Sequence, residues 1–185
     1  HVYLFDNFTF GRTLVSHAAN APATVANGAA TTPLVAADGS FVAFQSTGTN
    51  LVSGQLDTNG SGDVFLYDVG TGSITVVSHQ NLSSTTTANG ASRPLAISLD
   101  GQYVLFASTA TNLVSGQIDS NGGEDLFLFD RLTDTVTLLS HAAANASTAA
   151  NAATSTATMS TDGQFVTFAS TATNLVAGQV DTVGT

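Results

Sequence analysis

Two loops of this sequence carry oxygen-bearing side chains at a spacing that suits a hard cation. Both contain the pattern D-x-N-x-x-x-D, at Asp57, Asn59 and Asp63 and again at Asp119, Asn121 and Asp125. Carboxylate and amide oxygens at alternating positions of a glycine-rich loop are the ligands that Ca²⁺ prefers. The spacing is similar to the start of a calcium-binding loop, although the bidentate Glu of the twelfth position is absent. The sequence therefore predicts two calcium sites, and the alternative is that the same residues only form turns and cap strands.

A third loop of the same kind begins at Asp181 and lacks two of the three oxygen ligands. Val183 occupies the position of Asn59, and the residue that would complete the site corresponds to His1 instead of an Asp. An aliphatic side chain offers no oxygen to a cation. We therefore expect cation binding at the first two loops and none at the third.

Groups suited to catalysis are scarce in this chain. Its 185 residues include one Glu, no Cys and no Lys, and the sequence contains no G-x-S-x-G elbow. The Asp residues that precede a Gly are Asp38, Asp100 and Asp162. Each is explained as part of a hairpin turn, because Asp and Gly both tolerate positive φ. An enzyme needs convergent groups with tuned pKa values, so we predict that the chain is not an enzyme and holds no catalytic residue.

These candidate residues belong to a repeat of 62 residues that runs through the chain without insertion or deletion. The landmarks are a Ser-His pair ending at His17, His79 and His141, the three Asp-Gly pairs, and Asn-Leu-Val from Asn50, Asn112 and Asn174. A fixed period indicates one supersecondary unit that has been duplicated and stacked. The copies 1–62, 63–124 and 125–185 are interpreted as one tandem-repeat segment. It starts and stops inside a repeat, so we expect it to be part of a longer array or a unit of an assembly.

The charge balance excludes two classes of partner. Only 9% of the residues are charged, three of them are Arg, and the net charge is −10. A chain this poor in cations lacks the basic surface that nucleic acid or anionic lipid requires. With no Cys, disulfides are excluded as well. Abundant Ala, Thr, Ser, Gly and Asn with no Lys favour a bacterial extracellular or cell-surface protein, without membrane insertion.

The second copy predicts four strands separated by turns. The strands are expected at 63–68, 74–78, 94–99 and 102–108, joined by loops at 79–92 and 109–124. The Ala-rich segment Ala142–Ala153 carries no apolar stripe, so it is interpreted as a loop. The runs Val2–Phe5, Val64–Tyr67 and Leu126–Phe129 are apolar at every position, and strands of this kind are covered on both faces. Four antiparallel strands covered by neighbouring repeats predict an all-β fold of β-propeller blades, about three in number. A flat β-solenoid is the competing architecture.

The segment Pro94–Asp130 carries a family resemblance. It contains S-x-D-G-Q-x-V-x-F-x-S-T-A-T-N-L-V followed by D-x-N-x-x-x-D-x-F-L-x-D, which resembles the TolB-like (WD40-like) β-propeller repeats of bacterial extracellular proteins. The resemblance implies that the S-x-D-G strand lies nearest the propeller axis. It also implies that the chain begins with two outer strands, continues with two full blades and ends with two inner strands. The third copy departs from the pattern, since Thr156 replaces the strand-opening Pro.

The three histidines that follow Ser belong to a residue type that often binds metal ions. Equivalent residues of different blades lie far apart, and the strand that precedes each of them is the outermost. His17, His79 and His141 are therefore interpreted as loop or edge residues instead of a metal cluster.

The first copy has two aromatic residues that the blade itself does not require. Phe8 and Phe10 lie in the turn between the outer strands, where the other copies have Gly70 and Gly72 or Leu132 and Asp134. Clustered exposed apolar groups often mark an interface, so we predict contact with another copy of the chain there; the alternative is that both rings fold back on a neighbouring blade. The sequence as a whole predicts a non-catalytic structural or adhesive repeat protein that assembles into a filament. The alternative is a propeller module that binds glycan or peptide.

Overall fold

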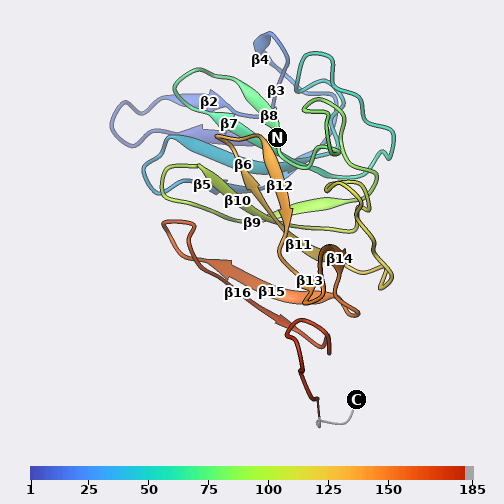
Figure 1. Cartoon of the computed structure of the whole chain (residues 1–185). Helices are drawn as coiled ribbons and strands as arrows, with labels where there is room; N and C mark the ends of the chain where they lie inside the picture. The colour runs from blue at the N-terminus through green and yellow to red at the C-terminus, as the bar shows by residue number, and fades with distance from the viewer. Residues whose placement is uncertain (182–185) are drawn as a thin grey trace.

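The computed structural model describes residues 1–181. The regular secondary structure in that range consists of β-strands alone. Two four-stranded antiparallel sheets form its centre (Figure 1). Their strands are β5 (Ala30–Val35), β6 (Phe41–Ser46), β7 (Asp63–Asp68) and β8 (Ile74–Val76), followed by β9 (Ser92–Ile97), β10 (Tyr103–Ser108), β11 (Asp125–Asp130) and β12 (Thr135–Leu138). A two-stranded sheet lies at each end, β1 (Tyr3–Phe5) with β2 (Arg12–Leu14) and β15 (Thr154–Met159) with β16 (Val166–Ser170). The predicted all-β fold class is confirmed.

Each four-stranded sheet combines strands from two sequence copies. The inner strands β5 and β6 come from the first copy, while β7 and β8 come from the second. β6 pairs with β7 from Phe41 opposite Asp68 to Ser46 opposite Asp63. β10 pairs with β11 in the same register, 62 residues further along the chain. The predicted order of two outer strands, two full blades and two inner strands is therefore confirmed.

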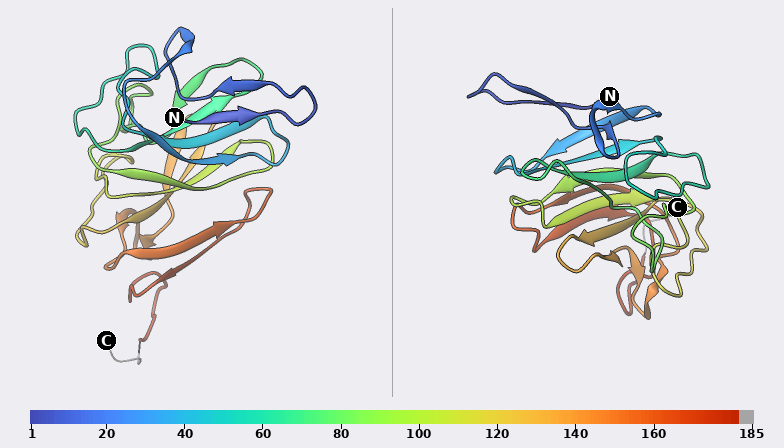
Figure 2. Two further views of the ribbon diagram at one scale, coloured as in Figure 1. Left: turned by 180° about the vertical axis from the view of Figure 1, so that it is seen from behind. Right: turned by 90° about the horizontal axis from the view of Figure 1, so that it is seen from above.

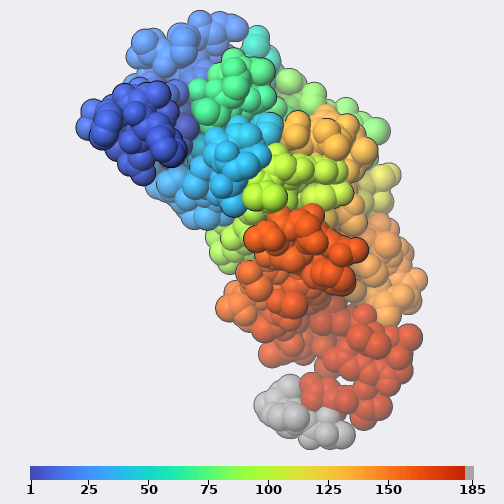
Figure 3. Space-filling view, turned by 90° about the vertical axis from the view of Figure 1, so that its left-hand side faces the viewer, coloured from blue at the N-terminus to red at the C-terminus, as the bar shows by residue number. Residues whose placement is uncertain are grey.

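The sheets follow one another in chain order and form an open stack. Figures 1 and 3 show the N-terminal hairpin at one end of the stack and the β15–β16 pair toward the other. Within residues 1–181 the blade-like sheets do not close into a ring. Among these residues there is also no helix of the length and hydropathy that a membrane span requires.

The apolar runs behave as predicted in the two full sheets and not in the first hairpin. Val64–Tyr67 is buried throughout, and three of the four residues of Leu126–Phe129 are buried. In β1, by contrast, Tyr3 is 62% exposed and Phe5 is 45% exposed. The prediction that Val2–Phe5 is covered on both faces was wrong. Val2 packs against the following sheet, but among the described residues no sheet precedes β1 and β2 to cover the face of Tyr3 and Phe5.

Neighbouring sheets pack closely at the Asp-Gly turns. Gly101 has φ +66, and a Cβ built on it would lie 2.3 Å from Cδ2 of Phe41 in the preceding sheet. Gly163 makes the equivalent approach to Tyr103. These glycines serve both the left-handed turn and the close stacking of one sheet on the next (Figure 2).

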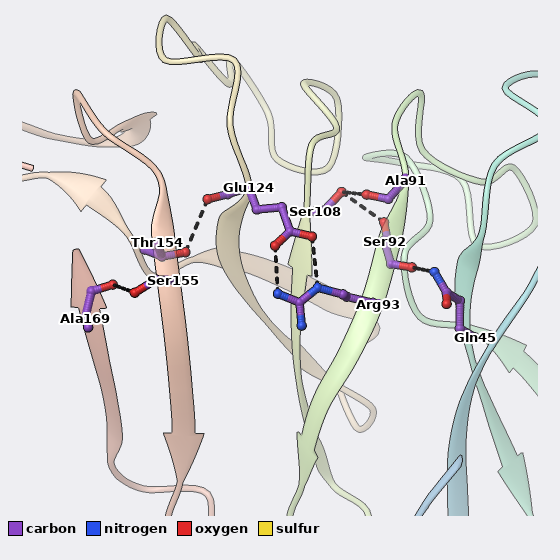
Figure 4. A network of polar contacts seen from close by, with 9 residues as sticks. All are labelled: Gln45, Ala91, Ser92, Arg93, Ser108, Glu124, Thr154, Ser155 and Ala169. Atoms are coloured by element: carbon purple, nitrogen blue, oxygen red, sulfur yellow. Dashed lines mark hydrogen bonds and ion pairs between the residues drawn. The ribbon is translucent and has the colours of Figure 1, made fainter. Parts of the chain in front are cut away.

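Polar contacts join the inner strands of adjacent sheets (Figure 4). Nε2 of Gln45 on β6 donates to the carbonyl oxygen of Ser92 on β9, at 2.8 Å. Arg93 forms a bidentate pair with Glu124, with N–O distances of 2.9 and 2.7 Å. The Glu124 carbonyl accepts the hydroxyl of Thr154 on β15 at 3.2 Å. The inner edge of the stack is thus tied together by hydrogen bonds as well as by apolar packing.

Two segments that were expected to be loops contain short strand pairs. These are β3 (His17–Ala18) with β4 (Ala21–Val25) and β13 (His141–Ala142) with β14 (Asn145–Ala149). The interpretation of Ala142–Ala153 as a loop was therefore wrong for its first half. β14 is held from outside its own hairpin, because Ile118 donates its N–H to Ser147 at 2.9 Å and accepts from Ala149 at 2.8 Å. Such pairing needs no apolar periodicity in the segment itself.

Candidate functional site

The Asp57 loop is a turn whose polar groups are largely used within the loop. Oδ1 of Asp57 accepts the backbone N–H groups of Asn59 and Gly60, each at 3.0 Å. The amide oxygen of Asn59 accepts the N–H of Ser61 at 2.5 Å, and its amide nitrogen donates to the carbonyl of Ala88. Asn59 therefore fixes the loop against the following segment. Oδ2 of Asp57 is different, since it is buried and has no hydrogen-bond partner.

The Asp119 loop repeats this arrangement. Oδ1 of Asp119 accepts the N–H groups of Asn121 and Gly122 at 2.9 and 3.1 Å. Asn121 accepts the N–H of Gly123 at 2.6 Å and donates to the carbonyl of Ala150 at 2.7 Å. In both loops the Asx turns match the alternative that Asp and Asn act as turn-forming residues.

Asp63 opens β7 and is 1% exposed. The hydroxyl of Ser78 donates to Oδ1 of Asp63 at 3.1 Å and accepts the N–H of Val64 at 3.0 Å, so the Ser-Asp pair joins the end of one outer strand to the start of its neighbour. Burial raises the pKa of Asp63 to about 7, and the charge of Asp57 contributes in the same direction. The charge of Asp57 thus disfavours the ionisation of Asp63 and raises its pKa.

Asp125 occupies the same position at the start of β11. It accepts the hydroxyl of Ser140 at 2.9 Å, and burial raises its pKa to about 6, with a further contribution from the charge of Asp119. Among residues 1–181 no group of three or more His, Cys, Asp or Glu side chains is arranged to hold a metal ion. Each loop therefore offers a pair of carboxylates, which a proton or one cation can neutralise. Val183 of the third loop lies outside the described residues.

The histidines after the outer strands are buried, not exposed at an edge. His17 and His79 are 6% and 5% exposed. Their rings make edge contacts with Tyr67 and Phe129, each with 5.9 Å between ring centroids. His17 and His79 lie outside the four-stranded sheets, as loop or edge residues do, and they are buried because the segments after the outer strands pack against the next sheet. His141, in contrast, is only partly buried.

Each of these two buried histidines lines a groove. The groove at His17 has a volume of about 490 Å³, and the groove at His79 has a volume of about 410 Å³. The turn residue that faces the histidine differs between them, since Gly72 lines the first groove and Asp134 lines the second. Oδ1 of Asp134 lies 3.5 Å from Nε2 of His79. Sequence reasoning did not find the pair of His79 and Asp134. Its only signal in the sequence is Asp134 at the position where the second copy has Gly72.

Phe8 and Phe10 lie at the tip of the β1–β2 hairpin. They are 96% and 73% exposed. Phe10 makes an edge contact with Phe5 of its own hairpin, with 6.4 Å between ring centroids. The alternative in which both rings fold back on a neighbouring blade does not hold for Phe8, which remains almost entirely exposed.

Comparisons with known proteins identify no family for this chain. No family model matches the chain, and no curated protein matches it. Among solved structures, the chain is similar to TolB from Acinetobacter baumannii with a TM-score of 0.45 and 16% sequence identity. The match covers 90% of this chain and 31% of that protein, so the chain spans less than a third of its length. It is a similarity of chain arrangement and carries no inference about activity.

Proposed function

We propose that the chain is a non-catalytic structural module of the bacterial cell surface that assembles by completing its half-blades. The observation that carries the proposal is that the two terminal sheets are complementary halves of the central sheets. β16 corresponds to β6 and β10, whereas β1 corresponds to β7 and β11, and among the described residues β1 and β16 each have an unpaired edge. An unpaired strand edge presents N–H and C=O groups that template pairing with another chain.

The pairing register of the completed sheet follows from the repeat. In the first full sheet Phe41 lies opposite Asp68 and Ser46 lies opposite Asp63. Transfer of this register by the repeat period places Ser170 of β16 opposite His1 of an incoming hairpin. No residue has to be inserted or removed within the paired strands.

The exposed apolar side chains of the first hairpin lie on a face that the completed stack would cover, because the partner's preceding sheet would then pack against it. Tyr3 is 62% exposed and Phe5 is 45% exposed, while their equivalents Phe65 and Tyr67 in the first full sheet are 0% and 4% exposed. Burial of each large side chain stabilises an assembly by roughly 1.5–3 kcal/mol before the cost of association is counted. A second copy of the chain supplies the missing strands when the 185-residue chain is alone in solution.

The first test is the oligomeric state of Ala169→Lys. Ala169 is exposed on β16, whereas its equivalent Ala107 on β10 is 1% exposed, so a charge there is tolerated in the free chain and not in a completed stack. Light scattering should show concentration-dependent assembly of the wild type and a monomeric variant. Ser155→Lys is the matched control, because the second copy has Arg93 at that position. A monomeric wild type, or equal assembly of wild type and Ala169→Lys, contradicts the proposal.

The hairpin tip is proposed to add contacts to the partner copy. Phe8 and Phe10 are exposed and follow the strand that is to be paired. Replacement of both by Gly, as in the second copy, should weaken assembly without lowering the melting temperature of the monomer. Assembly that is unchanged by this replacement removes the hairpin tip from the interface.

We also propose that calcium stabilises the Asp57 and Asp119 loops. The buried Oδ2 of Asp57 without a hydrogen-bond partner and the adjacent buried Asp63 support this proposal, because a hard cation favours paired carboxylate oxygens. Calcium should raise the melting temperature by mass action, and a chelator should reverse the change. A melting temperature that responds to neither reagent identifies the loops as turns only.

A further inference from the structure

The groove beside His79 contains a buried ring nitrogen without a hydrogen-bond partner. The groove lies between the loop after β8, the loop after β10 and the turn that leads into β12. His79 is 5% exposed and lines the groove, and its Nε2 has no hydrogen-bond partner. A buried polar atom of this kind requires an explanation, because its desolvation is uncompensated.

The other ring nitrogen fixes the tautomer of the neutral imidazole. Nδ1 of His79 lies 3.0 Å from the carbonyl oxygen of Gln80. A carbonyl only accepts, so Nδ1 carries the proton and Nε2 presents a lone pair. Metal-binding histidines often make such a contact to a backbone carbonyl. Here it belongs to the repeated turn, because Nδ1 of His17 and Nδ1 of His141 also lie 2.9 Å from the carbonyl oxygen of the next residue.

Asp134 places a second electron-pair donor beside this lone pair. Its Oδ1 lies 3.5 Å from Nε2 of His79, so in the neutral imidazole two acceptors face each other. Asp134 has φ +53, a left-handed conformation that favours glycine. The second copy has Gly72 at this position, with φ +73. The backbone of the turn therefore does not require a carboxylate.

The separation of the two atoms suits a shared metal ion. Zn²⁺ lies about 2.0–2.1 Å from an imidazole nitrogen or a carboxylate oxygen. An ion bonded to both atoms at their separation of 3.5 Å makes an N–Zn–O angle of about 115°, close to the tetrahedral value of about 109°. Its remaining positions face a groove lined by Asn81, Ser115 and Thr135, which water and side-chain oxygens can fill.

We propose that Nε2 of His79 and the carboxylate of Asp134 form a binding site for a borderline transition-metal ion such as Zn²⁺. Two protein ligands leave the site open, so the ion is exchangeable and accessible from the groove. The groove at His17 provides an internal contrast. There Nε2 of His17 lies 3.2 Å from the carbonyl oxygen of Gly72, and the turn has no carboxylate at that position.

Calorimetric titration with Zn²⁺ alone tests the site. The background is His1→Ala, because a terminal histidine with a free amine can chelate metal by itself, and excess calcium occupies any hard-cation site. One ion should bind per chain, and Asp134→Gly should weaken binding by at least about tenfold. Asp134→Gly recreates the turn of the second copy, which has Gly72 there, so its fold is expected to persist.

Nitrogen NMR of the histidines gives the second readout. Zn²⁺ should shift Nε2 of His79 and leave Nε2 of His17 unchanged, and His17→Gln should retain the wild-type affinity. The proposal is overturned if Asp134→Gly and His79→Gln both bind Zn²⁺ as tightly as the background chain. It is also overturned if no binding is seen, in which case the two residues form only an imidazolium–carboxylate pair.

Discussion

Replacement of Asp63 by Asn tests whether its buried carboxyl group controls the pH dependence of stability. Asp63 is 1% exposed, accepts a hydrogen bond from Ser78 and lies beside the charge of Asp57. Asn retains a carbonyl oxygen for the hydroxyl of Ser78 and does not ionise. It also offers N–H donors in the neighbourhood of the buried Oδ2 of Asp57, which has no hydrogen-bond partner. The variant therefore removes a buried charge without removing the strand connection.

The sign and the size of the effect follow from the pKa of Asp63. Burial raises this pKa from 3.8 to about 7. A raised carboxyl pKa contributes stability that is fully present below pH 3.8 and is lost as pH rises through the folded-state value. Since one pKa unit corresponds to about 1.36 kcal/mol, the wild type loses about 4 kcal/mol from this group between pH 4 and pH 8. Asp63→Asn does not undergo this loss.

Urea unfolding in the presence of a chelator measures the difference. At pH 8 the free energy of unfolding of Asp63→Asn should exceed that of the wild type by a few kcal/mol, and at pH 4 the two should be close. Asp125→Asn should show the same trend with a smaller amplitude, because the pKa of Asp125 is raised only to about 6. An equal pH dependence of wild type and Asp63→Asn would refute the reasoning. If calcium binds the loop, its addition should raise the free energy of unfolding of the wild type more than that of Asp63→Asn.

Two further predictions concern a glycine at the contact between two sheets and an ion pair within one sheet. Gly101→Ala should destabilise the chain by roughly 2 kcal/mol or more, because the added Cβ would lie 2.3 Å from the ring of Phe41. Gly39→Ala is the control, in the equivalent Asp-Gly turn with no atom within 4 Å, and it should cost only about 1 kcal/mol. Equal losses of stability in thermal unfolding would contradict the packing argument. Glu124→Gln should lower the free energy of unfolding by less than about 1 kcal/mol, since the pair with Arg93 is partly exposed. This loss of stability should become smaller at high salt. A larger loss that is independent of salt would assign Glu124 a buried structural role.

The repeat period explains why so much of the fold was predictable from the sequence. Strand type, strand order and the pairing of one copy with the next all depend on local patterns that recur every 62 residues. The Asp-Gly turn and the apolar run at Val64–Tyr67 are examples, because turn chemistry and complete apolar character are properties of neighbouring residues. The pairing register of β10 with β11 then follows from that of β6 with β7.

Only the tertiary structure decided how individual side chains are used. Burial of Asp63 depends on the sheets that surround it, so its raised pKa had no signal in the D-x-N-x-x-x-D pattern. The exposure of Tyr3, when its equivalent Phe65 is buried, depends on whether a preceding sheet packs against that face. His79 and Asp134 are separated by 55 residues, and they meet because consecutive sheets bring the end of β8 against the turn before β12. A periodic sequence specifies the unit and its repetition, whereas a contact between units is determined by the geometry of stacking.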